Sequence, residues 1–178
     1  VGFHLPQLEG GVTNLSFGLN QGTFEAREIH IRDHHYHFTL SYGTGAYIME
    51  TPVPGKHNVL NTTAAAAGLH NLMNCDTFQR ALKTFKGVYR RLEWVVKSGS
   101  QVLVDDYAHH PNELTYAIQT LKELYPGSRI TGIFQPHLYS RTRDFAAGFA
   151  EALSYLDRVL LLPIYPAREE PIPGVSSN

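Results

Sequence analysis

The sequence predicts an α/β protein in two parts, an antiparallel sheet with a helical hairpin followed by a parallel α/β domain. Three observations support this prediction. Residues 12–40 contain short segments in which apolar and polar side chains partly alternate, as in half-buried strands. Residues 59–73 are rich in alanine and leucine, which favours a helix. After Gly87 the pattern changes to strands that alternate with helices, which is typical of a parallel sheet.

In the first part, residues 1–87, we expect three antiparallel strands before two packed helices. Asn58 is a suitable N-cap for the first helix, and Asn61 follows about one turn later on the same side. The second helix is predicted to begin at Asp76, which has the spacing of a capping box with Gln79. The predicted elements are strands 12–17, 24–31 and 35–40 and a first helix over 59–73.

In the second part, residues 88–178, a hairpin precedes the alternating strands and helices. Loop residues 97–100 separate two apolar segments, which indicates the hairpin. Crossover helices bring the carboxyl ends of parallel strands to one edge of a sheet. We therefore expect the polar strand ends 105–110, 135–143 and 165–170 to lie along that edge. The predicted elements are hairpin strands 92–96 and 101–105, strand 102–106, helix 112–124, strand 129–134, helix 142–156 and strand 158–163.

Composition argues against several classes of protein. Lys and Arg number 15 against 16 Asp and Glu, a net charge of −1, so no broad basic surface is available for nucleic acid or anionic membranes. No apolar run reaches the roughly 18 residues that a membrane helix needs, and residues 1–11 lack the profile of a signal peptide. The single cysteine, Cys75, fits a reducing compartment. We expect a cytoplasmic protein with no nucleic-acid or membrane partner.

Clustered histidines leave a metal-dependent alternative open. The sequence Asp33-His34-His35 spells the tripeptide that names a family of metal-dependent phosphoesterases. A solvated turn between two strands is the simpler interpretation, because no further carboxylates follow nearby. We expect no protein-bound metal, and a non-catalytic binding module is the other alternative. The residues that the metal-dependent alternative would use are His30, His34, His35, His37, Asp33, Asp105 and Asp106.

Five motifs give the chain a resemblance to a known family. They are, in order, GKHNVLNTTAAAAG, FKGVYRRLE, VDDYAHHPNEL, FQPHLYSRTRDF and YPAREEPIPGV. Together they resemble the ATP-dependent Mur ligases, which build the peptide of bacterial cell-wall precursors, over residues 50–178. Within the family, the motifs are most similar to those of members that add L-alanine to UDP-N-acetylmuramate. Members that attach recycled murein tripeptide are the second choice, because they depart from FQPHxYxRT.

The resemblance implies that this chain is part of a three-domain enzyme. Residues 1–87 resemble the distal part of the central ATP-binding domain, and residues 88–178 resemble the first part of a Rossmann-like C-terminal domain. The GxxxxGK[ST] phosphate loop does not occur, since Glu50 and His57 flank Gly55-Lys56 at positions that the motif reserves for other residues. We therefore expect the chain alone to be inactive, with Mg²⁺ ligands mainly in the missing part of the central domain. Uncovered edges and apolar faces also predict self-association.

The resemblance also implies a reaction and a nucleotide site. ATP phosphorylates the lactyl carboxylate and the alanine amine attacks the acyl phosphate, so positioning and cationic side chains dominate catalysis. Each implied residue also has a simpler structural interpretation: Asn58 can be only a helix cap and Arg90-Arg91 only a solvated pair. The implied nucleotide-binding residues are Asn58 and Asn61 at the adenine, Arg91 at the phosphates, and Asp106 with Tyr107 at the ribose.

The amino-acid side of the implied site comes from later strand ends. His109, His137 and Arg141 resemble the residues that surround the incoming alanine, with the guanidinium of Arg141 suited to its carboxylate. Many alanine-adding members have arginine where this chain has Leu138, which leaves one cation fewer here. By contrast, His110 is followed by proline and is better suited to cap a helix than to bind substrate.

Overall fold

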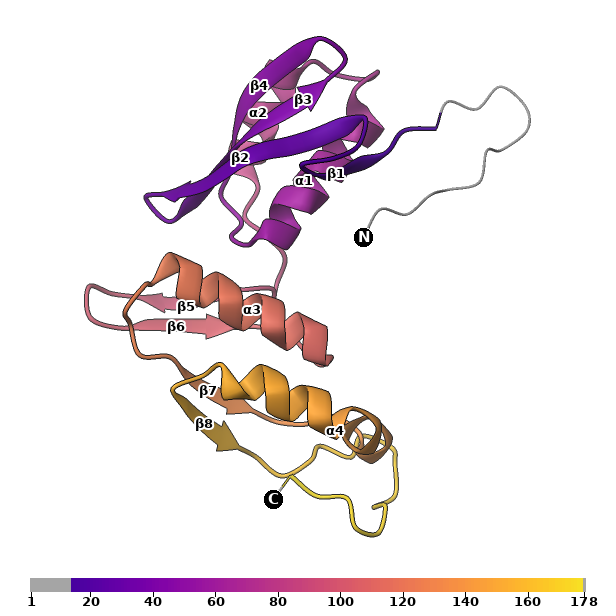
Figure 1. Cartoon of the computed structure of the whole chain (residues 1–178). Helices are drawn as coiled ribbons and strands as arrows, with labels where there is room; N and C mark the ends of the chain where they lie inside the picture. Colours follow the sequence, from indigo (N-terminus) through magenta and orange to yellow (C-terminus); the bar gives the residue numbers. More distant parts are fainter. Residues whose placement is uncertain (1–13, 178) are drawn as a thin grey trace. The chain divides into compact units, whose positions relative to one another are not determined.

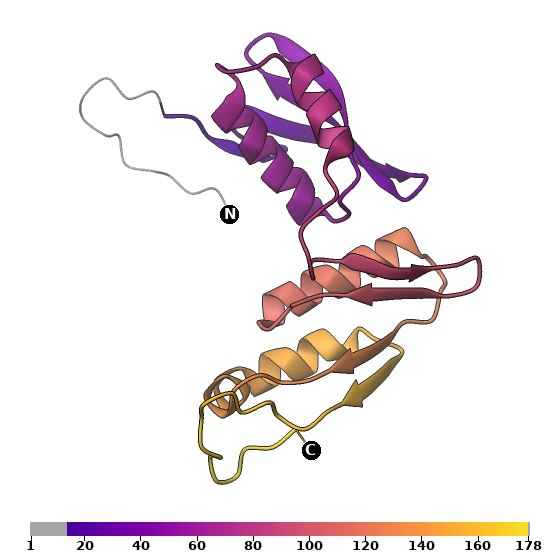
Figure 2. The same cartoon turned by 180° about the vertical axis from the view of Figure 1, so that it is seen from behind.

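The computed structural model describes residues 14–177 and divides the chain into two compact units, with the boundary between Gly87 and Val88. Figures 1 and 2 show the chain from opposite sides. The signal-peptide assessment of residues 1–11 and the first two residues of predicted strand 12–17 lie outside the described residues. No helix in the described part of the chain is both long and apolar enough to cross a membrane.

The first unit contains a four-stranded sheet with the order β1-β2-β3-β4. Strands β2 and β3 are two of the three predicted strands and pair in antiparallel orientation as expected. Strand β4 was not predicted and adds to β3 in antiparallel orientation, whereas β1 pairs in parallel with β2, Phe17 opposite Phe24. The expectation of a fully antiparallel sheet is wrong for β1. The connection, which has positive φ angles at Asn20 (54°) and Gly22 (103°), returns the chain to the start of β1, where the Phe24 N–H donates to the Ser16 carbonyl, so that β2 runs in the same direction. The strands are β1 (Phe17–Leu19), β2 (Phe24–Arg32), β3 (His35–Tyr42) and β4 (Gly45–Thr51).

The turn between β2 and β3 contains Asp33 and His34, whose φ angles are 54° and 63°. Two consecutive positive φ angles are typical of hairpin turns that match the twist of the strands. The interpretation of these residues as a turn between strands is therefore confirmed. His35 begins β3, where its Nδ1 lies 2.6 Å from Oε1 of Glu50. Within residues 14–177, no group of three or more His, Cys, Asp or Glu side chains is placed to hold a metal ion.

Two helices, α1 (Lys56–Leu69) and α2 (Cys75–Thr84), cover one face of this sheet (Figures 1 and 2). Alternation along β3 turns Tyr36, Phe38 and Leu40 toward the core, where each is at most 1% exposed. This alternation confirms the strand character expected from the sequence.

The caps of both helices differ from the predicted ones. Helix α1 begins after Gly55, so Asn58 lies inside its first turn and does not cap it. Helix α2 is capped by Asn74, which accepts a hydrogen bond from the Thr77 backbone N–H at 2.9 Å. The prediction of Asp76 as the cap is wrong because the extended backbone at Asn74 already directs its side-chain oxygen at the free N–H groups of the first turn.

The second unit has the predicted order of strands and helices but not a single sheet. An antiparallel hairpin and a parallel pair of strands form two separate two-stranded sheets, β5-β6 and β7-β8. The alternation of strands and helices in the sequence predicts their order but not which strands pair. In this unit the contact between α3 and α4, and not strand pairing, connects the two halves. The elements are β5 (Glu93–Lys97), β6 (Val102–Asp105), α3 (Pro111–Leu124), β7 (Thr131–Phe134), α4 (Tyr139–Ser154) and β8 (Arg158–Leu161).

Helices α3 and α4 lie on the same side of the two small sheets (Figures 1 and 2). A core of Phe134, Phe149 and Leu153 joins α4 to β7. Gly148 of α4 lies against Pro111, the first residue of α3: a Cβ atom at this glycine would be 2.9 Å from the proline ring. The missing side chain thus permits the close approach of the two helices.

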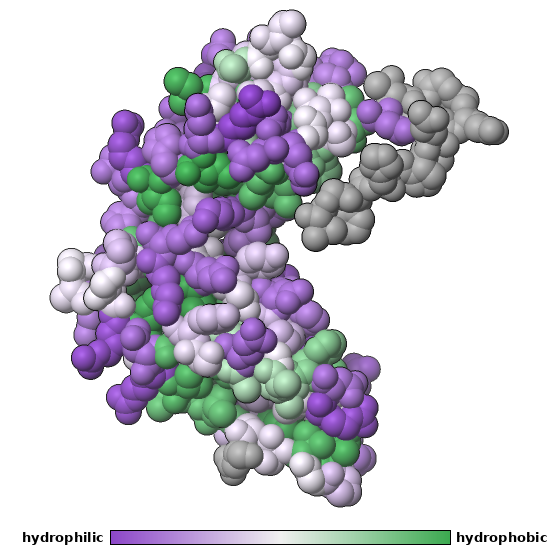
Figure 3. All heavy atoms as spheres, viewed as in Figure 1, coloured by the Kyte–Doolittle hydropathy of each residue, from purple (hydrophilic) through white to green (hydrophobic). Residues whose placement is uncertain are grey.

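Large apolar side chains also remain exposed in the second unit. Val95, Leu103 and Ile133 are each more than half exposed, at 56%, 52% and 65%. On the side drawn in Figure 3, hydrophobic and hydrophilic residues are interspersed over the surface. Parallel sheets are usually covered on both faces, so the exposed Ile133 of β7 indicates an apolar surface available for further packing.

Candidate functional site

Asp106, just after β6, is bound to the backbone through both carboxylate oxygens. Its Oδ2 accepts a hydrogen bond from the Leu92 N–H at 2.8 Å, and its Oδ1 accepts one from the Ala108 N–H at 2.7 Å. Leu92 is only 4% exposed, so its N–H has little access to water. Each carboxylate oxygen can accept a further hydrogen bond. Asp106 therefore orders the loop after β6 and can still accept from a ligand hydroxyl.

Tyr107 stands beside an arginine that sequence reasoning left out of the site. The guanidinium carbon of Arg90 lies 4.9 Å from the centroid of the Tyr107 ring, and Arg90 Nε donates to Oδ2 of Asp105 at 3.2 Å. The Tyr107 backbone N–H donates to the Arg90 carbonyl at 2.8 Å. Arg90 is thus paired and not merely solvated, and it holds the exposed tyrosine ring at the end of β6.

Arg91 and His109 meet at a second unpredicted residue, Glu113 of α3. Arg91 Nη1 donates to Oε1 of Glu113 at 3.3 Å, and the His109 backbone N–H donates to Oε2 at 2.9 Å. Burial alone would raise the pKa of Glu113, but the hydrogen bond from His109 and the nearby charges of His109 and Arg91 lower this pKa below its ordinary value. Glu113 is therefore an anion at neutral pH. An acidic residue in the first turn after His110-Pro111 was the available sequence signal.

Helix α3 begins as predicted, with His110 as its cap and Pro111 as its first residue. The His110 ring accepts a hydrogen bond from the Asn112 backbone N–H at 3.3 Å. The same ring contacts Phe145 of α4 edge-on, with 4.7 Å between centroids. His110 is thus a structural residue that connects the loop after β6 to the first half of α4.

His137 and Arg141 belong to the loop after β7 and the first turn of α4. His137 forms a parallel bridge with Tyr165, and their rings stack with 5.5 Å between centroids. Leu138 occupies the N-cap position of α4 with a positive φ of 73° and no side-chain cap, and its N–H donates to the Tyr165 carbonyl at 2.9 Å. The predicted meeting of the strand ends after β7 and β8 is thereby confirmed.

Glu169, from the segment after β8, completes the start of α4. It accepts from the Ser140 backbone N–H at 2.9 Å and from the Ser140 hydroxyl at 2.5 Å. These hydrogen bonds, together with the charge of Arg141, lower the pKa of Glu169. Sequence reasoning missed Glu169, since its partner lies 29 residues away and no local pattern links them.

Asn58 and Asn61 lie on the first two turns of α1, in the other unit. The Asn58 amide donates to the Pro54 carbonyl at 2.6 Å, and the Asn61 amide donates to Oδ1 of Asn58 at 3.3 Å. The two amides thus form one hydrogen-bonded pair at the start of a helix. The predicted residues therefore fall into three groups: this pair, the cluster from Arg90 to Glu113, and the cluster at the start of α4.

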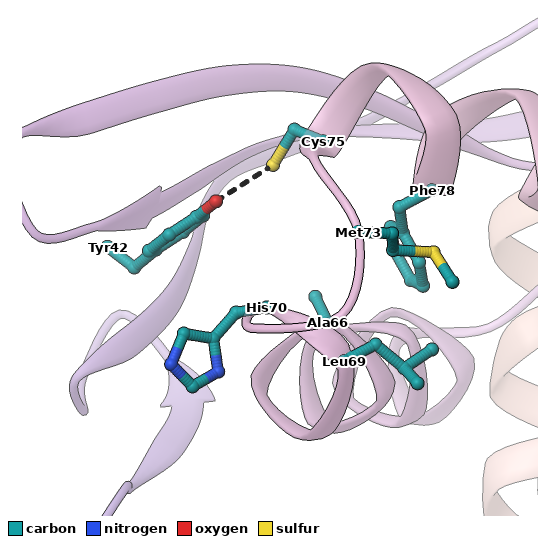
Figure 4. Close-up of a pocket in the computed structure, with 7 residues that line it drawn as sticks. All are labelled: Tyr42, Ala66, Leu69, His70, Met73, Cys75 and Phe78. Carbon is teal, nitrogen blue, oxygen red and sulfur yellow. Dashed lines mark hydrogen bonds between the residues drawn. The ribbon is translucent and has the colours of Figure 1, made fainter.

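A small cavity in the first unit contains none of these residues. It measures about 10 Å³, room for about one water molecule. Figure 4 shows the Tyr42 hydroxyl directed at the sulfur of Cys75, 3.4 Å away. That hydrogen bond and burial raise the pKa of Tyr42. The lining residues are Tyr42, Ala66, Leu69, His70, Met73, Cys75 and Phe78.

Comparison with known proteins places both units in one class of enzyme. Residues 7–69 match the Mur ligase middle domain, and residues 90–177 match the domain described as "Mur ligase, glutamate ligase domain". The chain belongs to the Mur ligase family, which confirms the resemblance seen in its motifs.

Curated proteins that are similar in sequence to this chain include several UDP-N-acetylmuramate--L-alanine ligases. The UDP-N-acetylmuramate--L-alanine ligase of Parabacteroides distasonis is 47% identical over 97% of this chain. That of Christiangramia forsetii is 44% identical over 93% of it. The chain spans only 38% and 37% of the length of these relatives.

Solved structures show the same fold. UDP-N-acetylmuramate-alanine ligase from Thermotoga maritima matches 85% of this chain, with a TM-score of 0.75 and 30% identity, and the match covers 34% of that structure. Folylpolyglutamate synthetase from Lactobacillus casei matches 84% of the chain and 36% of its own, with a TM-score of 0.60 and 19% identity. The second likeness concerns the fold alone.

Proposed function

We propose that this chain is part of a cytoplasmic, ATP-dependent ligase that adds L-alanine to UDP-N-acetylmuramate in peptidoglycan precursor synthesis. Residues 1–87 would be the distal part of the central ATP-binding domain, and residues 88–178 the first part of the Rossmann-like C-terminal domain. The observation that carries this proposal is the connected polar cluster at the carboxyl end of β6, where Arg91, Asp106 and His109 are held by backbone and side-chain hydrogen bonds.

The reaction has two steps. A lactyl carboxylate oxygen attacks the γ-phosphorus of ATP and ADP leaves; the alanine nitrogen then attacks the acyl carbon, and the C–O bond to phosphate breaks as the amine loses its proton. Both steps move negative charge between oxygen atoms, so fixed cations and hydrogen-bond donors lower the barriers. The residues present in this chain supply such groups for the nucleotide and for the amino acid.

On the nucleotide side, Asn58 and Asn61 would bind the adenine, and Arg91 the phosphates. The Asn58–Asn61 amide pair offers both a donor and an acceptor to a base edge. Asp106 and Tyr107 would border the ribose: the carboxylate is already fixed by two backbone N–H groups and has capacity for a hydroxyl. The ordered carboxylate would lose little entropy when the ribose binds.

On the amino-acid side, His109, His137 and Arg141 would surround the alanine. The Arg141 guanidinium suits the alanine carboxylate, because its paired N–H donors match a carboxylate in geometry and charge. Leu138 adds no cation, so Arg141 would carry this recognition without a neighbouring arginine at position 138.

Mg²⁺ accompanies ATP in the proposed reaction, where it would neutralise phosphate charge. The residues of this chain do not fit its site, because among residues 14–177 no group of three or more His, Cys, Asp or Glu side chains is placed to hold an ion. We expect its ligands in the remainder of the central domain, and no step above is assigned to Mg²⁺ bound by this chain.

A chimaera tests the proposed function. This chain replaces the matching 38% of the Parabacteroides distasonis ligase, and phosphate release is measured with ATP, UDP-N-acetylmuramate and L-alanine. We expect release that requires both acceptor and alanine, and none from the chain alone. Release that ignores alanine but requires murein tripeptide would assign the chain to the recycling ligases instead, and a folded chimaera without either activity would refute the proposal.

We also propose that the chain by itself self-associates through the second unit. The exposed side chains of Val95, Leu103 and Ile133 support this, because large apolar side chains exposed on strands favour association. Light scattering over a hundredfold range of concentration would show a mass that increases with concentration. A constant monomer mass would contradict this proposal without affecting the proposed enzyme activity.

A further inference from the structure

We propose that Glu113 is a positioning residue that holds Arg91 and His109 in a fixed relation, one at the nucleotide phosphates and the other at the amino acid. This inference rests on the proposed function, since the roles of Arg91 and His109 come from it. Glu113 would touch neither substrate and would act through its two partners.

The contacts of Glu113 join two segments that are distant in the sequence. Its Oε1 accepts from Arg91 Nη1 at 3.3 Å, across 22 residues, while its Oε2 accepts from the His109 backbone N–H at 2.9 Å. The His109 ring Nδ1 lies 3.4 Å from the same Oε2. One carboxylate thus connects the segment before β5 to the loop after β6.

Helix capping alone does not explain these contacts. In a capping box the third helical residue accepts from the backbone N–H of the cap residue. Here the cap is His110, and Glu113 accepts instead from His109, one residue earlier. The His110 ring already satisfies an N–H of the first turn, that of Asn112. The carboxylate is therefore directed away from the helix and toward the loop of the proposed site.

A contact within the loop after β6 determines which nitrogen of the His109 ring carries the hydrogen. Its Nδ1 lies 2.9 Å from the Tyr107 carbonyl oxygen, which can only accept, so Nδ1 carries the hydrogen. The Glu113 carboxylate lies near that N–H as a second acceptor. In the neutral ring, Nε2 then has its lone pair available to a substrate proton. By holding the histidine backbone, Glu113 would set where that lone pair is presented.

Substitutions in the chimaera separate positioning from a structural role. Glu113→Gln keeps an acceptor for the His109 N–H and loses the charge opposite Arg91, so we expect the KM for ATP to rise about fivefold, near the upper end for a partly exposed ion pair. The KM for alanine should change little. Glu113→Ala also removes the acceptor for His109, so the KM for alanine should rise as well. Glu151→Gln, an exposed acid on α4, is the matched control and should change neither constant.

A double-mutant cycle identifies the route of the effect. If Glu113 acts through Arg91, Arg91→Ala and Arg91→Ala combined with Glu113→Gln will have the same KM for ATP. A purely structural glutamate would lower kcat through loss of folded enzyme and leave both KM values unchanged. That result would overturn the proposal. So would a fold-increase in the KM for ATP of the double variant equal to the product of the fold-increases of the two single variants.

Hydrogen exchange provides a readout that does not depend on activity. The His109 amide should exchange faster in Glu113→Ala than in the unmodified chimaera, and Glu113→Gln should retain its protection. Unchanged exchange of the His109 amide in Glu113→Ala would show that Glu113 does not protect this amide, and it would contradict the inference even if the ligase is active. Altered exchange in a folded chimaera without alanine-dependent release would instead leave the contact in place and refute the proposed function.

Discussion

Glu113 and Glu169 each support one cluster of the proposed site, by different means. Glu113 is partly buried and pairs with a guanidinium and with the backbone of a proposed site residue. Glu169 is also partly buried, but it binds the backbone and hydroxyl of Ser140. The first glutamate therefore pairs directly with a charged side chain, whereas the hydrogen-bond partner of the second is Ser140, in the first turn of a helix. We infer that the hydrogen bonds of the loop after β6 contribute more to folding stability than those at the start of α4.

The largest effect should come from breaking the first cluster at Asp106. Asp106→Ala would leave the N–H groups of Leu92 and Ala108 without their acceptor, and we expect the free energy of unfolding to fall by about 2–3 kcal/mol. Urea denaturation measures this change. Asp144→Ala is the control from the other cluster, because its exposed pair with Arg143 should contribute less than about 1 kcal/mol. Equal losses from the two variants would show that the loop after β6 does not contribute more to stability than the start of α4.

A smaller effect is expected from the second cluster on substrate use. Arg141→Ala in the chimaera should raise the KM for alanine about tenfold, since a charge-assisted contact to its carboxylate is lost. The KM for ATP should remain nearly constant. Arg143→Ala provides the neighbouring control, because Arg143 is paired with Asp144. If Arg141→Ala raised both constants alike, the guanidinium would not be specific to the amino acid.

Glu169→Gln should have a weaker effect on stability than Asp106→Ala. The amide oxygen can still accept one hydrogen bond from Ser140, and Glu169 makes no direct ion pair with a described residue that the substitution would break. We expect a small decrease in Tm by calorimetry and a larger one for Glu169→Ala. A decrease in Tm comparable with that of Asp106→Ala would show that the start of α4 contributes as much to stability as the loop after β6.

The pH dependence of stability provides the smallest and most specific comparison. The pKa of Glu113 is lowered in the folded protein, so its contribution is present above the ordinary glutamate pKa of about 4.3 and is lost as the pH falls through the lower folded value. The difference in unfolding free energy between wild type and Glu113→Gln should therefore shrink on acidification below about pH 4. A difference that grew in acid would have the wrong sign for a lowered pKa.

Much of the second unit could be predicted from sequence, because its elements follow local patterns. The starts of β6, α3 and β8 agree with prediction to within one residue, and His110 caps α3 as expected. The separate sheets could not be predicted, since strand pairing depends on packing between distant segments. Glu169 was missed for the same reason, because its partner Ser140 lies 29 residues away, and the pairing of Glu113 with Arg91 spans 22 residues.

Local competition explains the errors in the first unit. Asn58 has a side chain suited to a helix cap. However, Gly55, with a φ of 104°, occupies the N-cap position, so α1 begins before Asn58. At the start of α2, Asn74 and Asp76 both have suitable side chains, and the residue with the extended backbone became the cap. Residue type alone does not distinguish such neighbours.

Gly148 has a consequence for engineering. Replacing a helical glycine with alanine commonly stabilises a protein by up to about 1 kcal/mol, so this position would be chosen in a search for thermostable variants. Here the added methyl group would clash with the Pro111 ring and push α3 and α4 apart. Such a variant would change the spacing between the cluster from Arg90 to Glu113 and the cluster at the start of α4 while altering none of their residues. Position 148 therefore offers a way to adjust the geometry of the proposed site from outside it.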